Sequence, residues 1–127
     1  MIHKHVLVAN RVRRPPRQGF SWVDRRFLHQ FLPKLPQEAT LLYFFLASVA
    51  DKNGLSYYRD DSIAYRLRMR QEALLAARDE LLRHDLIAHE APLTQILSLP
   101  RTERVRRSGL HALGELFQQA RDGDGQE

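Results

Sequence analysis

The chain has 127 residues, the size of one domain with short extensions, and it contains no cysteine, which excludes disulfides and thiolate metal sites. The apolar run in the first ten residues is too short for a secretory signal, and the most apolar stretch, residues 39–50, is too short to span a bilayer. The net charge of +5 comes mostly from arginine, which binds phosphate and guanine bidentately, so we expect a cytoplasmic, nucleoid-associated protein with a nucleic-acid partner and no membrane contact.

Residues 1–19 are predicted to form a basic arm in front of the main domain, which we place at residues 20–100. The arm has no acidic residue, and its arginines are Arg11, Arg13, Arg14 and Arg17. Pro15 and Pro16 exclude a helix interior, whereas residues 6–8 can form a short strand. Two interpretations remain open: a solvated tail, or an arm whose arginines lie along phosphates or in a minor groove.

Two helices with large apolar faces are predicted next. Ser21 is suited to cap a helix over residues 22–31. One side of that helix carries Trp22, Val23, Phe27, Leu28 and Phe31. Pro36 suits the first turn of a second helix, residues 36–50, which is apolar nearly all round and is therefore predicted to be the central buried helix. An alternative is that part of this helix faces a partner.

A turn with Gly54 at positive φ is predicted to lead into a strand over residues 55–58. A third helix is expected from Asp60 or Asp61 to Leu67, with Asp60, Asp61 or Ser62 as its cap. A fourth helix is expected over residues 70–84. Apolar residues recur three and four positions apart in both helices, and Met69 between them is expected to point inward. This pattern predicts a helix-turn-helix.

Two further strands, residues 86–89 and 95–99, are predicted to form a hairpin. The order helix, helix, strand, helix, helix, strand, turn, strand is that of a winged helix-turn-helix, in which the hairpin is the wing and the strand after Gly54 pairs with it. The predicted fold class is therefore α+β, mainly α with a small β-hairpin and an added amphipathic helix near the C-terminus.

Residues 101–121 are predicted to form a basic linker and that C-terminal helix, and residues 122–127 a disordered tail. The linker carries Arg101, Arg104, Arg106 and Arg107. One face of the helix over residues 108–121 carries Leu110, Leu113, Leu116 and Phe117. A lone helix of this length is marginal in water, so this face must pack on the domain or on a second copy.

Binding residues are expected mainly at the start of the fourth helix. Arg70, Gln71 and Ala73 are predicted to lie away from the core side, and Arg70 and Gln71 can contact guanine and adenine bidentately. Arg59, Arg66 and Arg68 are expected nearer to phosphates. The alternative is that these arginines form weak surface ion pairs with Asp60, Asp61, Glu72, Asp79 and Glu80. We favour DNA contact because the excess of arginine continues into the N-terminal arm and the basic linker.

Leu75 and Leu82 are seven residues apart beside the core positions of the fourth helix. They either widen the core, the interpretation that we favour, or form an exposed strip for a partner. Together with the C-terminal helix, they leave enough apolar surface to predict a homodimer, which suits a two-fold DNA site.

An enzymatic role is not expected. His3 and His5 flank a lysine in an arm without the strand context of a metal site, and Tyr57 and Tyr58 are better explained as strand residues, one of them packed inward. We find no glycine-rich phosphate loop and no nucleophile with a base and an acid, so no cofactor or metal is predicted.

Two stretches carry a family resemblance, IAYRLRMRQEALLAARDELLRHDLI and LPQEATLLYFFLASVADKNGLSYYRDDSIAYRL. They resemble the winged-helix domains of plasmid replication initiators and primosomal helicase-loader proteins over roughly residues 20–99. The resemblance implies double-stranded DNA binding by a transcriptional regulator or replication accessory of a bacterial chromosome or mobile element. The alternative is a protein-interaction module in a replication or transposition assembly.

The sequence departs from that family pattern at two places. Arg70 stands where a serine or threonine usually caps the reading helix, and the short wing tip carries Glu90 and no arginine. Because of these departures, we expect the contacts with the DNA backbone in the N-terminal arm and the basic linker rather than in the wing.

Overall fold

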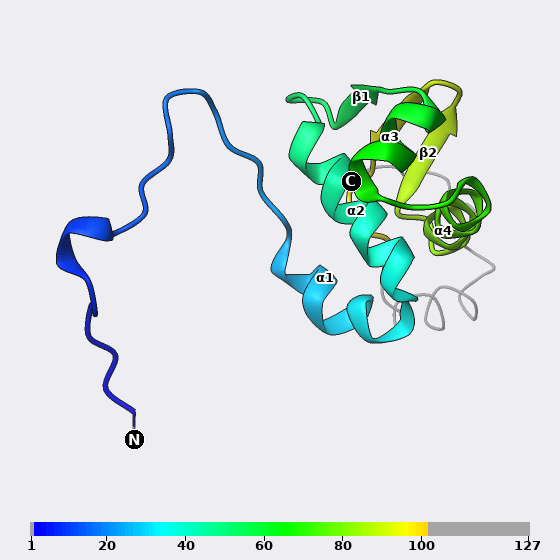
Figure 1. Ribbon diagram of the computed structural model, residues 1–127. Helices are drawn as coiled ribbons and strands as arrows, with labels where there is room; N and C mark the ends of the chain where they lie inside the picture. Colours follow the sequence, from blue (N-terminus) through cyan, green and yellow to red (C-terminus); the bar gives the residue numbers. More distant parts are fainter. Residues whose placement is uncertain (1, 102–127) are drawn as a thin grey trace, which may run out of the picture.

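A computed structural model describes residues 2–101. Residues 2–20 form an arm that extends away from the folded domain, with every residue exposed (Figure 1). Its one regular element is a short 3-10 helix, η1 (Ala9–Arg11). The predicted C-terminal helix, its linker from residue 102 onward and the tail lie outside the described residues, as do Arg104, Arg106, Arg107, Leu110, Leu113, Leu116 and Phe117.

Helix α1 (Arg25–Gln30) begins three residues later than predicted. Asp24, rather than Ser21, is the N-cap, because its carboxylate accepts hydrogen bonds from both the backbone N–H and the guanidinium of Arg26. These hydrogen bonds hold the pKa of the Asp24 carboxyl below its usual value. The hydroxyl of Ser21 instead donates to the Ser48 carbonyl. Of the apolar residues expected on one side of this helix, Phe27 and Phe31 are buried, whereas Trp22, Val23 and Leu28 are exposed.

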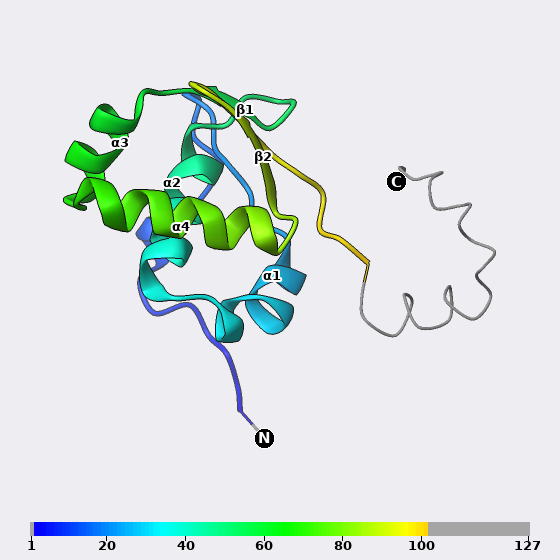
Figure 2. The same cartoon turned by 90° about the vertical axis from the view of Figure 1, so that its right-hand side faces the viewer.

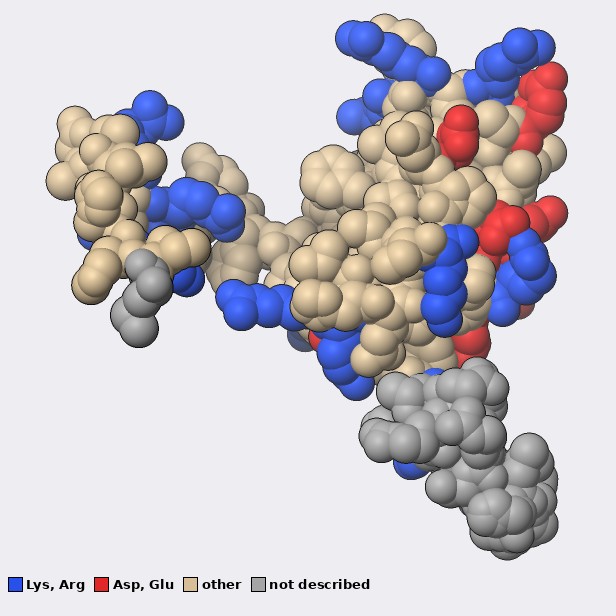
Figure 3. Space-filling model, turned by 90° about the horizontal axis from the view of Figure 1, so that it is seen from below, with Lys and Arg blue, Asp and Glu red and all other residues tan. Residues whose placement is uncertain are grey.

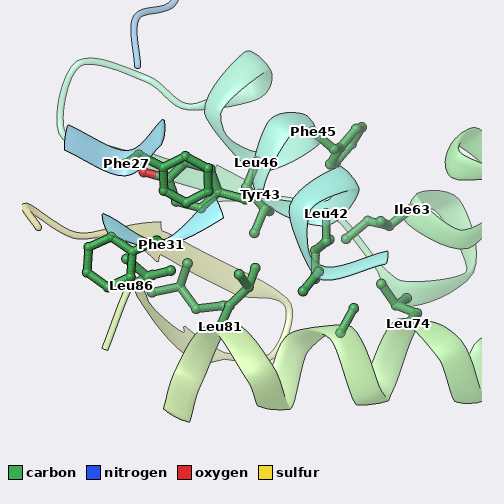
Figure 4. Close-up of a cluster of buried hydrophobic side chains, with 13 residues drawn as sticks. Phe27, Phe31, Leu42, Tyr43, Phe45, Leu46, Ile63, Leu74, Leu81 and Leu86 are labelled. Atoms are coloured by element: carbon green, nitrogen blue, oxygen red, sulfur yellow. The ribbon is translucent and has the colours of Figure 1, made fainter. Parts of the chain in front are cut away.

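Helix α2 (Gln37–Val49) is the central helix, reached from α1 through the 3-10 helix η2 (Leu32–Lys34). Pro36 occupies its N-cap position rather than its first turn. The helix is buried on most of its surface, as expected, but Leu41 and Phe44 remain exposed. Figure 4 shows how Leu42 of α2 lies among core side chains from other helices, where Tyr43 stacks on Phe27 with ring centroids 4.1 Å apart.

The predicted helix-turn-helix is formed by α3 (Asp60–Leu67) and α4 (Gln71–Arg83), which lie across α2 (Figure 2). Buried Ile63, Leu74 and Leu81 face the core, and Met69 in the turn packs against it half-buried, as expected. The predicted cap of α3 is wrong. Arg59 holds the N-cap position without a side-chain hydrogen bond, because the carboxylate of Asp60 is bound to Arg78 of α4.

Strands β1 (Leu55–Tyr57), β2 (Ile87–Glu90) and β3 (Leu93–Ile96) form an antiparallel sheet in the order β1-β3-β2. The strand after Gly54 therefore pairs with the hairpin, as predicted, although the hairpin strands differ from the predicted limits by one to three residues. Gly54 has φ +84°, and a Cβ there would lie 2.6 Å from the Ile96 carbonyl oxygen, so glycine is required. Tyr58 packs edge-on against Phe45, while Tyr57 is exposed.

These elements confirm a mainly α, α+β fold with a small antiparallel sheet, an arrangement consistent with a winged helix. Within residues 2–101, no helix combines the length and the apolar character that crossing a bilayer requires.

Candidate nucleic-acid interface

The turn between α3 and α4 presents arginine at two of its three positions. Arg68 ends α3 with φ 55° and ψ 47°, the left-handed conformation in which glycine is usual, and its backbone N–H bonds to the Ala64 and Tyr65 carbonyls. Arg70 is the N-cap of α4, and Gln71 is the first residue of that helix. All three side chains are exposed. The backbone of the turn thus directs two cations and an amide outward at the positive end of α4.

Two surface hollows meet at Gln71. The first, of about 790 Å³, is lined by Asp61, Ala64, Tyr65, Arg66, Arg68, Met69, Arg70 and Gln71. The second, of about 480 Å³, is lined by Arg59, Asp60, Asp61, Gln71, Ala91 and Pro92. Gln71 therefore lies where the helix-turn-helix corner and the tip of the wing approach each other, and four of the predicted binding arginines border the same two hollows.

The charges of this corner are only partly compensated. Arg59 pairs with Asp61, and Arg70 pairs with Glu72, each with an N–O distance of 3.5 Å and with side chains that are 67–84% exposed. Ion pairs this exposed contribute about 1 kcal/mol or less, so a phosphate can replace the carboxylate at small cost. Arg68 forms no ion pair with residues 2–101, and Arg66 lies 5.6 Å from the centroid of the Tyr58 ring. The predicted exposure is thus present, and of the alternative ion pairs only those with Asp61 and Glu72 form within residues 2–101.

A partly buried ion pair fixes the wing side of the corner. Arg78, on the inner side of α4 and 8% exposed, donates to the two carboxylate oxygens of Asp60 at 2.5 and 3.3 Å. This hydrogen bonding holds the pKa of the Asp60 carboxyl below its usual value. On the adjoining strands, His89 Nδ1 lies 2.8 Å from the Thr94 hydroxyl, and burial, reinforced by the charge of Arg78, lowers the pKa of His89. The ion pair between Arg78 and Asp60 links α4 to α3 and neutralises a carboxylate near the corner.

Sequence reasoning missed Tyr65 and Arg78. Tyr65 is 85% exposed and lines the larger hollow between the arginines. It follows Ile63 by two positions, which places it on the opposite side of α3 and would have revealed its exposure. Arg78 lies four residues after Leu74 and three before Leu81, and this spacing places it on the buried side of α4.

The remaining predicted site residues lie elsewhere. Ala73 is half-buried and lines, with Gln37 and Leu41 of α2, a hollow on the other side of the turn that also borders Arg68 and Arg70, and its contact with a base stays a prediction. The arginines of the N-terminal arm are exposed and distant from the corner, and Figure 3 shows basic side chains along that arm. Arg101 is the last described residue. Leu75 and Leu82 are 48% and 40% exposed, so the interpretation that they widen the core is wrong.

Comparison with known proteins adds little to this geometry. No family model and no curated protein matches the sequence. A solved structure described as "Structure of Rep-DNA complex" is similar over 87% of this chain and 93% of that chain, with 15% identity and a TM-score of 0.48. At this level of similarity, the case for a function depends on the residues of the chain itself.

Proposed function

We propose that this protein binds double-stranded DNA through the corner formed by Arg59, Arg66, Arg68, Arg70 and Gln71. The observation that carries the proposal is the convergence of these exposed side chains on the two hollows that meet at the first turn of α4. The role that fits best is that of a replication accessory or transcriptional regulator on a bacterial chromosome or mobile element.

Each side chain has a defined part in such a complex. Gln71 can accept from and donate to an adenine edge, and Arg70 can donate two hydrogen bonds to a guanine edge. Arg59, Arg66 and Arg68 surround these two residues and suit phosphate oxygens, which fix the register of a protein on a duplex. The backbone N–H groups at the start of α4 add to the positive potential there. Binding exchanges the weak pairs with Asp61 and Glu72 for phosphate contacts.

A salt series with a fluorescein-labelled duplex of random sequence tests this proposal. Fluorescence anisotropy should give an association constant that falls linearly on a log–log plot between about 50 and 200 mM salt, because bound phosphates release counterions. With three or four arginines on phosphates, the slope should be roughly −3 to −4. Absence of binding at the lowest salt concentration would overturn the proposal.

The second candidate is a protein-interaction module without sequence-specific DNA reading. The exposed Leu75 and Leu82 of α4 favour it, because apolar side chains on a reading helix contribute little to contacts with phosphates. The same salt series separates the candidates, since an interaction module has no steep salt dependence for random duplex. That the chain is not an enzyme stays a prediction.

A further inference from the structure

Along its outward side, α4 exposes a surface that differs from the corner. We define the α4 outer face as Glu72, Leu75, Asp79 and Leu82. The two leucines lie one above the other, roughly 10 Å apart along the helix, and the two carboxylates form a parallel row beside them. Glu72 has only its weak pair with Arg70, and Asp79 forms no ion pair with residues 2–101. This face is apolar and acidic, so a phosphate backbone is a poor partner for it.

The N-terminal arm has the complementary chemistry. Residues 1–20 carry five basic residues, Lys4, Arg11, Arg13, Arg14 and Arg17, and no acidic residue. They also carry exposed apolar side chains, among them Val6, Leu7, Val8 and Val12. A segment of this kind can cover two leucines with its apolar side chains and hold two carboxylates with its guanidinium groups, which bind carboxylates bidentately.

The arm and the α4 outer face of one chain lie apart. In Figure 1 the arm extends from the α1 side of the domain, whereas α4 lies at the other side. Figure 2, turned by 90°, shows α4 at the front and the arm behind it. We propose that the arm of one copy docks on the α4 outer face of a second copy. The exchange is reciprocal, so two arms close a symmetric dimer and leave no surface for further growth.

The arm is a better occupant of this face than a second α4. In an antiparallel pair of α4 helices with Leu75 on Leu82 of the other copy, the two-fold axis passes close to Asp79 and brings the two Asp79 carboxylates together. Arg83, the basic residue near that end of the helix, is already paired with Glu80. The arm supplies positive charge without that repulsion.

Sedimentation velocity of the full chain without DNA, over a range of concentrations, tests the apolar part of the contact. The wild type should form dimers, and the double variant Leu75→Ser/Leu82→Ser should raise the dimer dissociation constant roughly tenfold or more, because it removes the apolar contact. Leu41→Ser is the matched control, since Leu41 is 40% exposed, as is Leu82, but lies on α2. A monomeric wild type, or an equal effect of the control, would overturn the proposal.

Charge reversal tests whether the arm is the occupant. Glu72→Lys/Asp79→Lys and Arg13→Glu/Arg14→Glu should each weaken dimer formation. An equimolar mixture of these two variants should form heterodimers, because one interface has the wild-type charges and the other has both charges reversed. If the mixture stays monomeric, the arm binds its own α4 or another surface, and the proposal fails.

This test is independent of the proposed DNA binding. The variant Leu75→Ser/Leu82→Ser keeps every arginine of the corner, so it should still bind random duplex with a steep salt dependence. Dimer formation without DNA binding, or DNA binding without dimer formation, would each reject one proposal and leave the other standing.

Discussion

The corner at the start of α4 and the α4 outer face along the same helix present opposite chemistries. Arginine and glutamine side chains surround the first turn, next to the partial positive charge of the helix end. The α4 outer face is apolar and acidic. The two proposals assign these two surfaces of one helix to different partners, and four sets of substitutions test that division.

The largest effect is expected on the free energy of unfolding, from a comparison of two neighbours on α4. Leu74 lies on its buried side and Leu75 on its exposed side. Leu74 is fully buried, so Leu74→Ala should lower the free energy of unfolding by about 2–5 kcal/mol through lost burial and a cavity. Leu75→Ala should change it by less than about 0.5 kcal/mol in the monomer. Urea unfolding followed by far-UV circular dichroism measures both, and equal losses would show that α4 is rotated about its axis.

The next effect concerns the buried pair beneath the corner. Asp60→Asn removes the charge that pairs with the buried guanidinium of Arg78 and should cost about 1–3 kcal/mol. Asp61→Asn, whose partner Arg59 is exposed, should cost less than about 1 kcal/mol. Chemical unfolding at neutral pH compares the two variants. A larger loss for Asp61→Asn would show that Arg78 does not depend on Asp60.

The same pair predicts a pH dependence. Because the pKa of Asp60 is lower in the folded protein than in the unfolded chain, its contribution is fully present above about pH 4 and is lost as the pH falls toward the folded value. Asp60→Asn should remove this component of acid destabilisation. A component from His89, whose folded pKa is also lowered, should persist in the variant and appear as the pH falls below about 6.5.

A smaller effect is expected on DNA affinity. Arg68→Ala/Arg70→Ala should raise the dissociation constant for random duplex roughly tenfold and reduce the salt slope by up to about two, since two cations leave the corner. Arg83→Ala, at the far end of α4, is the matched control and should leave both values unchanged. Anisotropy titrations measure them, and an unchanged slope for the double variant would place the DNA surface elsewhere.

The smallest effect follows from the backbone of Arg68. Glycine favours the left-handed conformation that arginine adopts there at a cost, so Arg68→Gly should raise the free energy of unfolding by about 0.5–1 kcal/mol while weakening DNA binding. Asp85 at φ 61° offers the control, because Asp85→Gly should give a similar gain without altering DNA affinity. If Arg68→Gly destabilises the fold, its side chain contributes more to the native state than the strain costs.

The order of elements was predictable because it depends on local patterns. The spacing of Ile63, Leu74 and Leu81 and the turn at Gly54 identify helices and a strand without knowledge of their neighbours. The start of α1 was not predictable in the same way, since Ser21 and Asp24 are both good caps; in the structure Asp24 accepts the capping hydrogen bond from Arg26, and Ser21 donates to Ser48 of α2 instead. Tertiary contacts decide between such local alternatives.

The candidate site was likewise predictable where it depends on a local pattern and not where it depends on tertiary packing. Arg68, Arg70 and Gln71 follow from the helix-turn-helix pattern, and the structure leaves all three exposed. The approach of Pro92 to Gln71 depends on how the hairpin packs, which no local pattern reports. The exposure of Leu75 and Leu82 depends on the narrow width of the buried side of α4, where a salt-bridged arginine takes a place that an apolar residue would otherwise fill.

The position of Trp22, exposed just before α1 in the segment that leads from the arm, determines what fluorescence can report. It is the sole tryptophan of the chain and lines a surface hollow with Tyr43 and Ala47 of α2, so its emission responds to the place where the arm joins the domain. A melting curve followed by tryptophan emission would therefore report the separation of this segment from α2. Tyr43, buried against Phe27, is the chromophore whose environment changes when the helices separate.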